Sequence, residues 1–454
     1  MPQLIEQQRD FFNTNATKDI NFRKQQLQKL YDAIKSNEQL LYDAIYKDFK
    51  KSEFDTFTTE LALIYNDIIE AKKKVKKWSK RKRKRTNLVN LPAKSYVIPE
   101  PLGVSLVIGA WNYPYQLSFA PAVSAIVAGC TVILKPSEIP SNTSAAIAQI
   151  INTNFDPNYF KVVEGGIPQT TELLNQKFDK IFFTGSTAVG RIVYQAAAKH
   201  LTPVTLELGG KSPAFITNDC DLKKTVKRLV WSKFLNSGQT CIAPDYILLD
   251  NQIKDKFLAL LKEEIKNSHF STENGNYVQI VNSKNTERLI NLIDKSKVFI
   301  GGNYNIDSRI IEPTVLTNVT FEDKIMEEEI FGPILPIITY SNLDEVISKV
   351  KSRPKPLSCY VFTNNSKIKN KILNEISFGG GCVNDAVMHI SNSHFGFGGV
   401  GDSGIGSYHG EDGFKAFSHY KSILEKSNLI EPNLKYYPHT KGKLSLIKRV
   451  MGLK

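Results

Sequence analysis

The stretch SGQTC, residues 237–241, ends in a thiol that follows small and polar residues, and Pro244 comes three positions later. Such a cysteine either fills a small apolar space in the core or is a nucleophile presented on a tight turn. A free cysteine considered alone is more often a core residue, although a thiolate is a strong nucleophile. The choice between the two depends on whether other reactive groups meet this turn.

Two further segments carry groups that would complete nucleophilic chemistry. WNYP, residues 111–114, contains Asn112, whose side-chain amide can donate to an oxyanion. LELGGK, residues 206–211, contains Glu207, whose carboxylate can act as a general base. Each segment lies at the end of an expected strand or on a turn. We therefore expect the thiol of Cys241, the amide and the carboxylate to face one crevice.

A third pattern is typical of nucleotide binding. KIFFTGSTAVG, residues 180–190, leads from an expected strand through Gly185 and Ser186 to Gly190, where a helix should begin. The order G-x-T-x-x-G lacks the second glycine of the dinucleotide fingerprint, so it also fits a plain strand-to-helix turn. Backbone N–H groups at the start of such a helix would bind a pyrophosphate.

A charged pair after another expected strand supports a dinucleotide site. In TVILKPSE, residues 131–138, Lys135 and Glu138 follow the strand directly. A carboxylate at this edge accepts hydrogen bonds from ribose hydroxyls and repels a 2′-phosphate, so Glu138 favours NAD over NADP. Lys135 would soften that preference. GGKS at residues 209–212 is not a P-loop, because Thr205 stands where the first glycine belongs.

Strands and helices alternate along most of the chain, after a first section of about seventy residues with helical spacing. This alternation predicts an α/β protein with a doubly wound parallel sheet, whose ligands bind beyond the carboxyl ends of the strands. We expect strands at residues 103–111, 131–134, 160–165, 180–185 and 246–250, and the segment VTLELGGKSPAFIT, residues 204–217, carries Glu207 at a strand end or on a turn. We expect helices at residues 117–128, 141–152, 168–174, 188–199, 222–234, 254–266, 280–300 and 342–352.

Length and composition indicate a globular protein of two or three domains, with 454 residues, 41% hydrophobic and 23% charged. The five cysteines are scattered and form no CxxC pair, so disulfides are not expected and a reducing cytoplasm fits. The polar amino terminus lacks the order of a secretion signal. The apolar run at residues 118–134 is too short and too interrupted to span a bilayer, so we expect a buried helix ending at Gly129 and a strand.

Most of the net charge of +14 comes from one stretch. Residues 72–85 hold eleven Lys or Arg and no acid, which leaves 14 − 11 = +3 for the rest of the chain. Helical spacing continues through Val75 and Trp78, so a solvated helix end with two apolar anchors is expected rather than a nucleic-acid site, since no set of stacking aromatic residues accompanies it. Contact with an anionic membrane remains an alternative.

The combined motifs resemble those of aldehyde dehydrogenases, in particular the class 3 branch of fatty and aromatic aldehyde dehydrogenases. The likeness runs from about residue 5 to 430 and rests on LELGGK and GQTC, EEIFGP at residues 328–333 and FGGVGDSGIG at residues 397–406. The resemblance implies a Rossmann-like NAD-binding domain, an α/β catalytic domain and a small oligomerisation arm. The corresponding ranges are 1–85 with 100–207, then 208–400, then 86–99 with 415–430, and a tail at 431–454.

The same resemblance implies roles for individual residues. Cys241 attacks the aldehyde, Asn112 and the Cys241 N–H hold the oxyanion, and Glu207 activates the water that hydrolyses the thioester. Binding of NAD, or of NADP, would involve Trp111, Lys135, Glu138, Gly185, Ser186, Val189, Gly190, Leu208, Glu329 and Phe331. A substrate tunnel would be lined by Tyr65, Tyr113, Tyr115 and Trp231. No metal is expected, because His389 and His394 lack ligand-type neighbours at suitable spacing.

Partners and competing functions complete the sequence-based expectations. The resemblance implies medium- to long-chain or aromatic aldehydes as substrates and a homodimer in which residues 86–99 and FSHYKSIL, residues 417–424, pair across subunits. The basic and apolar tail at residues 443–454 could lie on an anionic membrane, or pack on the partner subunit. Alternatives are a CoA-acylating enzyme, a non-catalytic polyanion- or membrane-binding protein, and a structural protein with a relic fold.

Overall fold

A six-stranded sheet is the framework of the first lobe in this computed structural model, which describes residues 1–453. Its order is β17-β7-β6-β3-β4-β5, and only β17 runs antiparallel to its neighbour. The long apolar runs of the central strands are buried on both faces, as expected of a parallel sheet. The strands are β3 (Val104–Ile108), β4 (Thr131–Lys135), β5 (Phe160–Val162), β6 (Lys180–Thr184), β7 (Val204–Glu207) and β17 (Gly404–Ile405).

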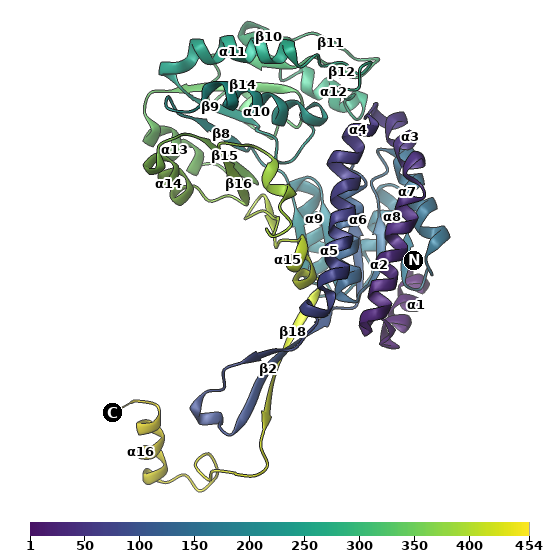
Figure 1. Cartoon of the computed structure of the whole chain (residues 1–454), viewed down its shortest axis with the longest axis vertical. Coiled ribbons are helices and arrows are strands. Elements are labelled where there is room, and N and C mark those ends of the chain that lie inside the picture. The colour runs from purple at the N-terminus through teal and green to yellow at the C-terminus, as the bar shows by residue number, and fades with distance from the viewer. Residues whose placement is uncertain (454) are drawn as a thin grey trace.

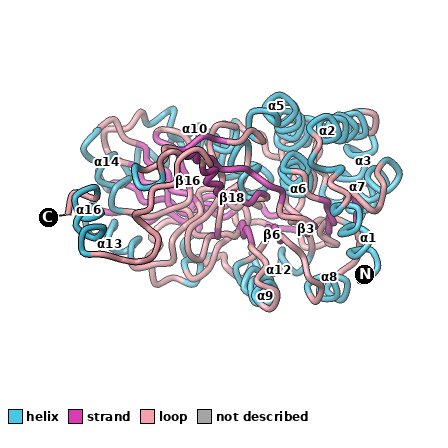
Figure 2. The backbone as a smooth tube through the Cα atoms, turned by 90° about the horizontal axis from the view of Figure 1, so that it is seen from below, coloured by secondary structure: helices cyan, strands magenta, loops and turns pink. Residues whose placement is uncertain are grey.

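Helices cover both faces of this sheet (Figures 1 and 2). One face packs against α6 (Gln116–Ala128) and α7 (Ser141–Asn154), and an outer layer of α2 (Ile20–Lys35), α3 (Glu38–Phe49), α4 (Glu53–Thr56) and α5 (Ala62–Trp78) covers these two. The other face packs against α1 (Pro2–Asn13), α8 (Ile167–Leu174) and α9 (Thr187–Ala198). The predicted doubly wound α/β arrangement is confirmed.

Helix α6 shows why the apolar run at residues 118–134 is internal. Every residue of α6 is buried, and the helix ends at Gly129, which adopts φ +100 and lets the chain turn into β4. Within residues 1–453, no helix is both long and apolar enough to cross a membrane.

The second lobe is built on a seven-stranded sheet of order β10-β13-β14-β9-β8-β15-β16. All neighbours are parallel except β10 and β13. Its strands are β8 (Pro213–Ile216), β9 (Tyr246–Asp250), β10 (Val298–Ile300), β13 (Thr314–Leu316), β14 (Ile334–Tyr340), β15 (Ser358–Phe362) and β16 (Gly380–Val383). Its helices are α10 (Leu222–Phe234), α11 (Lys254–Asn267), α12 (Ser283–Ile290), α13 (Leu343–Lys351) and α14 (Ser366–Glu375), and the small hairpin β11 (Tyr304–Asn305) and β12 (Ile310–Ile311) extends it.

The helix expected at residues 280–300 is only partly correct. Helix α12 covers its first part, starting after Asn282, whose side chain accepts from the N–H of Asn285. The last residues instead form β10, antiparallel to β13. A short apolar run fits a strand as well as a helix, and here pairing with β13 decides the outcome.

A three-stranded antiparallel sheet forms an arm that projects from the first lobe (Figure 1). It consists of β1 (Lys82–Lys84), β2 (Ala93–Pro101) and β18 (Ser418–Lys426), and α15 (Gly410–Ala416) leads into it. The arm begins at residue 82, so part of the basic stretch belongs to it. Strands β2 and β18 pair with each other within one chain, which differs from the predicted pairing of these segments across subunits.

The remainder of the basic stretch behaves as predicted. Val75 and Trp78 of α5 are buried, while Lys73, Lys76 and Lys77 of the same helix are exposed. At the other end of the chain, α16 (Lys441–Val450) lies beyond the tip of the arm, away from both lobes (Figure 1). Lys454, the last residue of the predicted tail, lies outside the described residues.

Candidate active site

Glu207 is the last residue of β7, where two other segments meet the strand. In the sheet it is in register with Thr184 of β6 and with Gly404 of β17, and its carbonyl accepts from the N–H of Gly185 at 3.0 Å. The side chain is buried, and neither carboxylate oxygen has a hydrogen-bond partner among the described residues. Burial raises the pKa of Glu207 well above its usual value. An unpaired buried carboxyl with a raised pKa suits a general base.

The turn before Cys241 is strained in a way that needs its small residues. Asn236 and Ser237 both have φ +53, and Gly238 has φ +71. A Cβ on Gly238 would lie 2.3 Å from the carbonyl oxygen of Gly332, so only glycine fits there. Strained backbone of this kind is concentrated at functional sites.

Side-chain amides fasten this turn to the Asn112 loop. The Asn112 amide donates to the Gln239 carbonyl at 3.0 Å, and the Asn236 amide donates to the Asn112 carbonyl at 2.9 Å. Gln239 itself donates to the carbonyls of Asn236 and Gln279, both at 3.1 Å. These hydrogen bonds therefore hold the Asn112 loop against Gln239, which is two residues before Cys241, although the two segments are far apart in the sequence.

The Cys241 thiol is in the field of two carboxyl groups. Burial raises the pKa of Cys241, and the charges of Glu329 and Glu207 raise it further. The resting thiol is therefore protonated. A positive charge brought next to the sulfur would lower this pKa and generate the nucleophile.

A buried ion pair that the sequence did not reveal supports the same loop. Lys51 and Glu60 are joined at 2.6 Å and are almost completely buried. The Lys51 ammonium lies 4.3 Å from the centre of the Tyr113 ring, and the Tyr113 hydroxyl is 2.6 Å from Thr240 Oγ1, next to the thiol. Glu60 also accepts from the N–H of Tyr115 at 2.8 Å, and it lies in a π-helical turn, Phe57–Leu61. Such turns occur frequently at functional sites.

A second buried ion pair joins the segments that follow Glu207 and Cys241 to EEIFGP, residues 328–333. Lys211, four residues after Glu207, contacts Asp245, four residues after Cys241, at 2.5 Å. Lys211 also donates to the carbonyl of Glu328 at 2.8 Å, and Asp245 accepts from the N–H of Ile330 at 2.9 Å. The pair thus holds the residues on both sides of Glu329. Sequence reasoning dismissed Lys211 as part of a false P-loop, and no local signal marked Asp245.

Glu329 and Phe331 extend from this clamp towards Gly209 and Trp111. A Cβ on Gly209 would lie 1.9 Å from Glu329 Oε2, so the carboxyl rests directly on the backbone that follows Glu207. Burial raises the pKa of Glu329 to about 8, with a further contribution from Asp245. Phe331 has φ +51, and its ring meets Trp111 edge to face, with centroids 5.3 Å apart.

The predicted phosphate turn lies at the amino terminus of α9. The Ser186 hydroxyl caps the helix by accepting from the N–H of Val189 at 3.4 Å. A Cβ on Gly190 would lie 2.6 Å from Leu208 Cδ2, so this glycine lets α9 pack against the chain beyond β7. Gly185 directly precedes this helix start, and Val189 in its first turn is exposed. The first turn of α9 thus offers free backbone N–H groups to a phosphate.

Lys135 and Glu138 lie at the end of β4, as predicted. The buried Lys135 ammonium donates to the Pro136 carbonyl at 2.8 Å and lies 3.5 Å from the half-exposed carboxylate of Glu138. Isoleucines that sequence reasoning missed are exposed around the same strand ends: Ile139, Ile167 and Ile192 are 39%, 78% and 58% exposed. Exposed apolar side chains at the starts of α8 and α9 suit the planar face of a base. These residues fit a dinucleotide.

The four residues predicted to line a substrate tunnel separate into two groups. Tyr113 lies beside the thiol turn, and Trp231 is 45% exposed on α10. Tyr65 instead donates to Glu38 at 2.6 Å and packs on Tyr31. Tyr115 donates to the Leu41 carbonyl at 2.7 Å and is fully buried. The rings of Tyr65 and Tyr115 therefore belong to the helical core, because their hydroxyl groups bond the outer helices.

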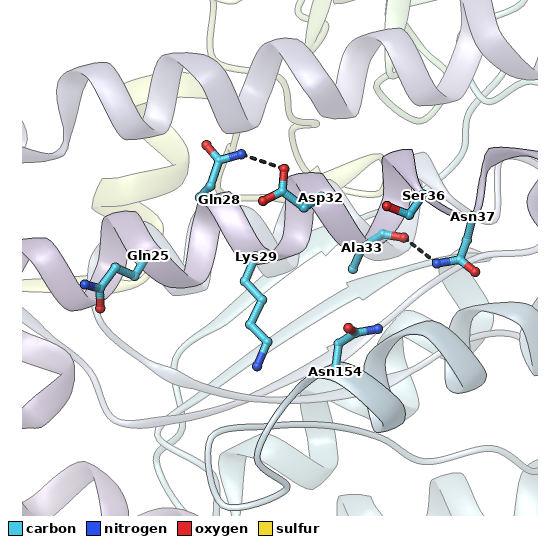
Figure 3. Close-up of a pocket in the computed structure, with 8 residues that line it drawn as sticks. All are labelled: Gln25, Gln28, Lys29, Asp32, Ala33, Ser36, Asn37 and Asn154. Atoms are coloured by element: carbon cyan, nitrogen blue, oxygen red, sulfur yellow. Dashed lines mark hydrogen bonds between the residues drawn. The ribbon is translucent and has the colours of Figure 1, made fainter.

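A hollow on the outer helical layer is separate from this site (Figure 3). The Gln28 amide donates to Asp32 at 2.7 Å there, and the Asn37 amide donates to the Ala33 carbonyl at 2.8 Å. These polar groups already bond their own helix, so the hollow presents no reactive arrangement. It is lined by Gln25, Gln28, Lys29, Asp32, Ala33, Ser36, Asn37 and Asn154.

Comparison with known proteins gives a consistent result over almost the full chain. The profile of the aldehyde dehydrogenase family matches residues 2–423. The 4,4′-diaponeurosporen-aldehyde dehydrogenase of Staphylococcus aureus (strain NCTC 8325 / PS 47) is 46% identical, with 96% of each chain covered. The dimeric NADP-preferring aldehyde dehydrogenase of Mus musculus is 43% identical, covering 97% of this chain and 98% of the relative. A substrate-bound structure of Staphylococcus aureus AldH superimposes with a TM-score of 0.96, 44% identity and 99% of each chain covered.

Proposed function

Because the chain belongs to the aldehyde dehydrogenase family, in its class 3 branch, we propose that Cys241, Asn112 and Glu207 are its catalytic residues. The protein is an oxidoreductase that converts aldehydes to carboxylic acids with NAD(P) as cofactor. The observation that carries the residue assignment is the linked position of the three groups. Hydrogen bonds between the Asn112 and Cys241 turns, and the clamp between Lys211 and Asp245, bring three distant motifs together.

The first step is attack of the Cys241 sulfur on the aldehyde carbon. The S–C bond forms while the carbonyl π electrons move to oxygen, which becomes an oxyanion. The Asn112 amide and the Cys241 backbone N–H donate to this oxyanion, and preorganised donors of this kind lower the barrier. The thiol proton passes to solvent water before the attack, because only the thiolate is a strong nucleophile.

The oxidation step needs the dinucleotide. A bound NAD(P)+ would supply the hydride acceptor for the former aldehyde carbon, and Cys241 would then carry the acyl group as a thioester. We assign the first turn of α9 to the phosphates, Glu138 to a ribose hydroxyl, and Glu329 with Phe331 to the nicotinamide end. Glu138 favours NAD, while the half-exposed position of its carboxylate and the adjacent Lys135 leave room for NADP.

The last step is hydrolysis of the thioester. Water attacks the acyl carbon, the C–S bond breaks, the thiolate leaves, and Glu207 takes the proton from the water. The buried, unpaired carboxyl of Glu207 favours water as the acceptor over CoA, which needs no such base. Adding CoA to the assay therefore leaves the product a free acid; formation of acyl-CoA would favour the CoA-acylating alternative.

The decisive experiment compares the wild type with Glu207→Gln. The wild type should form NADH from decanal and NAD, and the variant should stop at the thioester, which intact-mass measurement detects as an acyl group on Cys241. Trapping of the acyl group at another residue, or normal turnover of the variant, would contradict the assignment. Glu138→Gln is the matched control, since it should change the ratio of NAD to NADP use without trapping a thioester.

We propose medium- to long-chain or aromatic aldehydes as the substrates. Tyr113 beside the thiol and Trp231 at the surface of α10 offer aromatic contacts along the approach. One Staphylococcus aureus relative is named as a 4,4′-diaponeurosporen-aldehyde dehydrogenase. The value of kcat/KM should be higher for decanal than for acetaldehyde, and the reverse order would reject this proposal.

We also propose that the arm mediates a homodimer and that the tail contacts anionic membranes. Leu88, Val89 and Leu91 are exposed at the tip of the arm, where a second copy would cover them. The mouse relative is named as dimeric, which supports this reading. In α16, Leu444 and Val450 are exposed alongside Lys448 and Arg449, a combination that suits an anionic lipid surface. Sedimentation of the wild type should show a dimer, and Leu88→Asp should shift it towards the monomer. We place the protein in the cytoplasm, with peripheral contact at the membrane.

A further inference from the structure

Several polar atoms gather behind Glu207 without a hydrogen-bond partner. Among residues 1–453, the buried atoms with no partner include both Glu207 carboxylate oxygens, Thr184 Oγ1, the Tyr408 hydroxyl and Gln116 Nε2. Each unsatisfied buried group costs about 1–3 kcal/mol. Such groups usually pair with water or serve catalysis, so their accumulation at one place requires an explanation.

The fold places these groups on one face of the first sheet. Thr184 and Glu207 are register partners on the parallel strands β6 and β7, so their side chains project to the same face. Phe182, two residues before Thr184, projects to that face too, and its ring lies 4.8 Å from the Tyr408 ring. The Gln116 amide, at the start of α6, approaches the Tyr408 hydroxyl, which also experiences the Glu207 charge.

Titratable groups face this cluster from three elements. Cys241 acts on Tyr408 from the thiol turn, and Asp67 acts on it from α5. His409 stacks on the Tyr408 ring with centroids 4.1 Å apart, and its Nδ1 lies 3.5 Å from the Asp67 carboxylate. Asp67 is 13% exposed, so this side of the cluster leads towards solvent. Helix α6 and strand β6 contribute the neutral groups of Gln116 and Thr184.

We propose that Tyr408, Gln116 and Thr184 bind water behind Glu207, and that this water removes the proton that Glu207 takes during thioester hydrolysis. The inference rests on the proposed function. Glu207 gives its proton to the bound water, which passes a proton to the Tyr408 oxygen as the Tyr408 O–H proton passes to solvent water on the side of Asp67, which is 13% exposed. Tyr408 stays neutral and Glu207 returns to a carboxylate. A base with a raised pKa releases its proton slowly. A route that carries this proton away therefore speeds the return of Glu207 to its carboxylate form.

The test uses Tyr408→Phe, which removes one oxygen and keeps the ring. Full-length enzyme is mixed with decanal and NAD, quenched at intervals, and the acyl group on Cys241 is followed by intact mass while NADH is followed by absorbance. Hydrolysis of the acyl-enzyme should slow by about 10-fold, since positioned proton transfer contributes 10²–10⁴-fold in total. The rate of the first NADH turnover and the KM for NAD should not change, because neither step uses the cluster.

Two further variants separate this role from a structural one. Tyr420→Phe is the matched control, because the Tyr420 hydroxyl is equally without a partner within the described chain but belongs to β18 of the arm. It should leave hydrolysis unchanged. Thr184→Val should slow the same step as Tyr408→Phe, to a smaller extent.

The outcomes are distinguishable. Unchanged hydrolysis in Tyr408→Phe, equal slowing in Tyr420→Phe, or slowing of the first turnover by the same factor would overturn the inference while leaving the proposed function intact. A wild type that forms neither NADH nor an acyl group on Cys241 would instead overturn the proposed function, and this inference with it.

Discussion

Ion pairs are buried at the junction of the two lobes, whereas they are exposed in the arm and its tail. In the junction, Lys51 with Glu60 and Lys211 with Asp245 are enclosed pairs, with side chains no more than 10% exposed. In the arm, the partners Lys94 and Glu425 are 74% and 51% exposed and lie 4.0 Å apart. Enclosed pairs are weakly screened by salt and fix geometry, whereas exposed pairs are screened and contribute little.

The two regions also differ in the surroundings of ionisable side chains that lack an ion-pair or hydrogen-bond partner among the described residues. At the junction, Glu207 is buried without a partner among the described residues, which costs stability but creates a reactive base. Lys82 pairs with Glu411, but the other cations of residues 80–85 and Lys448 and Arg449 of α16 are exposed and available for association. Substitutions at the junction should therefore change chemistry or folding, and substitutions in the arm and tail should change only what the molecule binds.

The largest effect is expected from Cys241→Ser. A serine hydroxyl at this turn is far less nucleophilic than a thiolate, so NADH formation from decanal should fall below detection. The melting temperature should stay close to that of the wild type, because the two side chains are similar in size. Aldehyde oxidation at the wild-type rate would show that the sulfur is not the nucleophile.

Asn112→Ala should lower kcat by about 10²–10³-fold, the usual cost of one oxyanion donor. Asn37→Ala, in the outer hollow, removes an amide that bonds only the Ala33 carbonyl and serves as the control with normal kcat. Steady-state kinetics with decanal measures both. Equal rates for the two variants would remove Asn112 from the oxyanion site.

Lys211→Met tests the enclosed clamp against the exposed pair in the arm. Breaking a buried ion pair costs about 3–5 kcal/mol, and the KM for NAD should rise because Glu329 loses its support. Lys211→Arg should restore much of the loss. Lys94→Met should change stability by less than about 1 kcal/mol. Denaturant unfolding and NAD titration measure these effects. Equal losses in Lys211→Met and Lys94→Met would contradict the contrast between buried and exposed pairs.

Lys180 gives a pH-dependent test of a buried charge. Burial lowers its pKa to about 8, with its ammonium donating to Thr205 Oγ1 at 2.7 Å. Between that value and the unfolded pKa, near 10.5, the unfolded chain binds more protons, so stability rises with pH. Lys180→Met should reduce this rise by on the order of 1–3 kcal/mol. The test is the free energy of unfolding of both proteins from pH 7.5 to 10. If Lys180→Met keeps the same dependence of stability on pH, another buried lysine causes it, and Lys233 is the next candidate.

Removal of residues 439–454 should have the smallest effect on catalysis. The tail lies away from both lobes, so kcat with a water-soluble aromatic aldehyde should match that of the full chain (Figure 1). Flotation with vesicles containing anionic lipid should decrease, and raising the salt concentration should weaken the flotation of the full chain in the same way. Unaltered flotation of the truncated form would indicate that residues 72–85, and not the tail, contact the membrane.

Much of the site was predictable because its signals are local. The turn composition of SGQTC, the strand that ends at Glu207 and the strand-to-helix turn at Gly185 each depend on neighbours in the sequence. Helix α10 and strand β9 have the bounds that periodicity predicted. Tyr65 and Tyr115 were predicted to line a tunnel but lie in the helical core. Sequence could not separate the two positions, because a tyrosine has the same local pattern whether it faces a substrate or another helix.

The sequence by itself determined which chemical groups are present and which of them end strands or begin helices, since short-range periodicity and turn chemistry encode those properties. Only the tertiary structure decided that Lys211 meets Asp245, that Lys51 meets Glu60 beneath Tyr113, and that Tyr65 turns into the helical core. These contacts join residues far apart in the chain, and they depend on how two sheets and their helices pack. No local pattern carries that information.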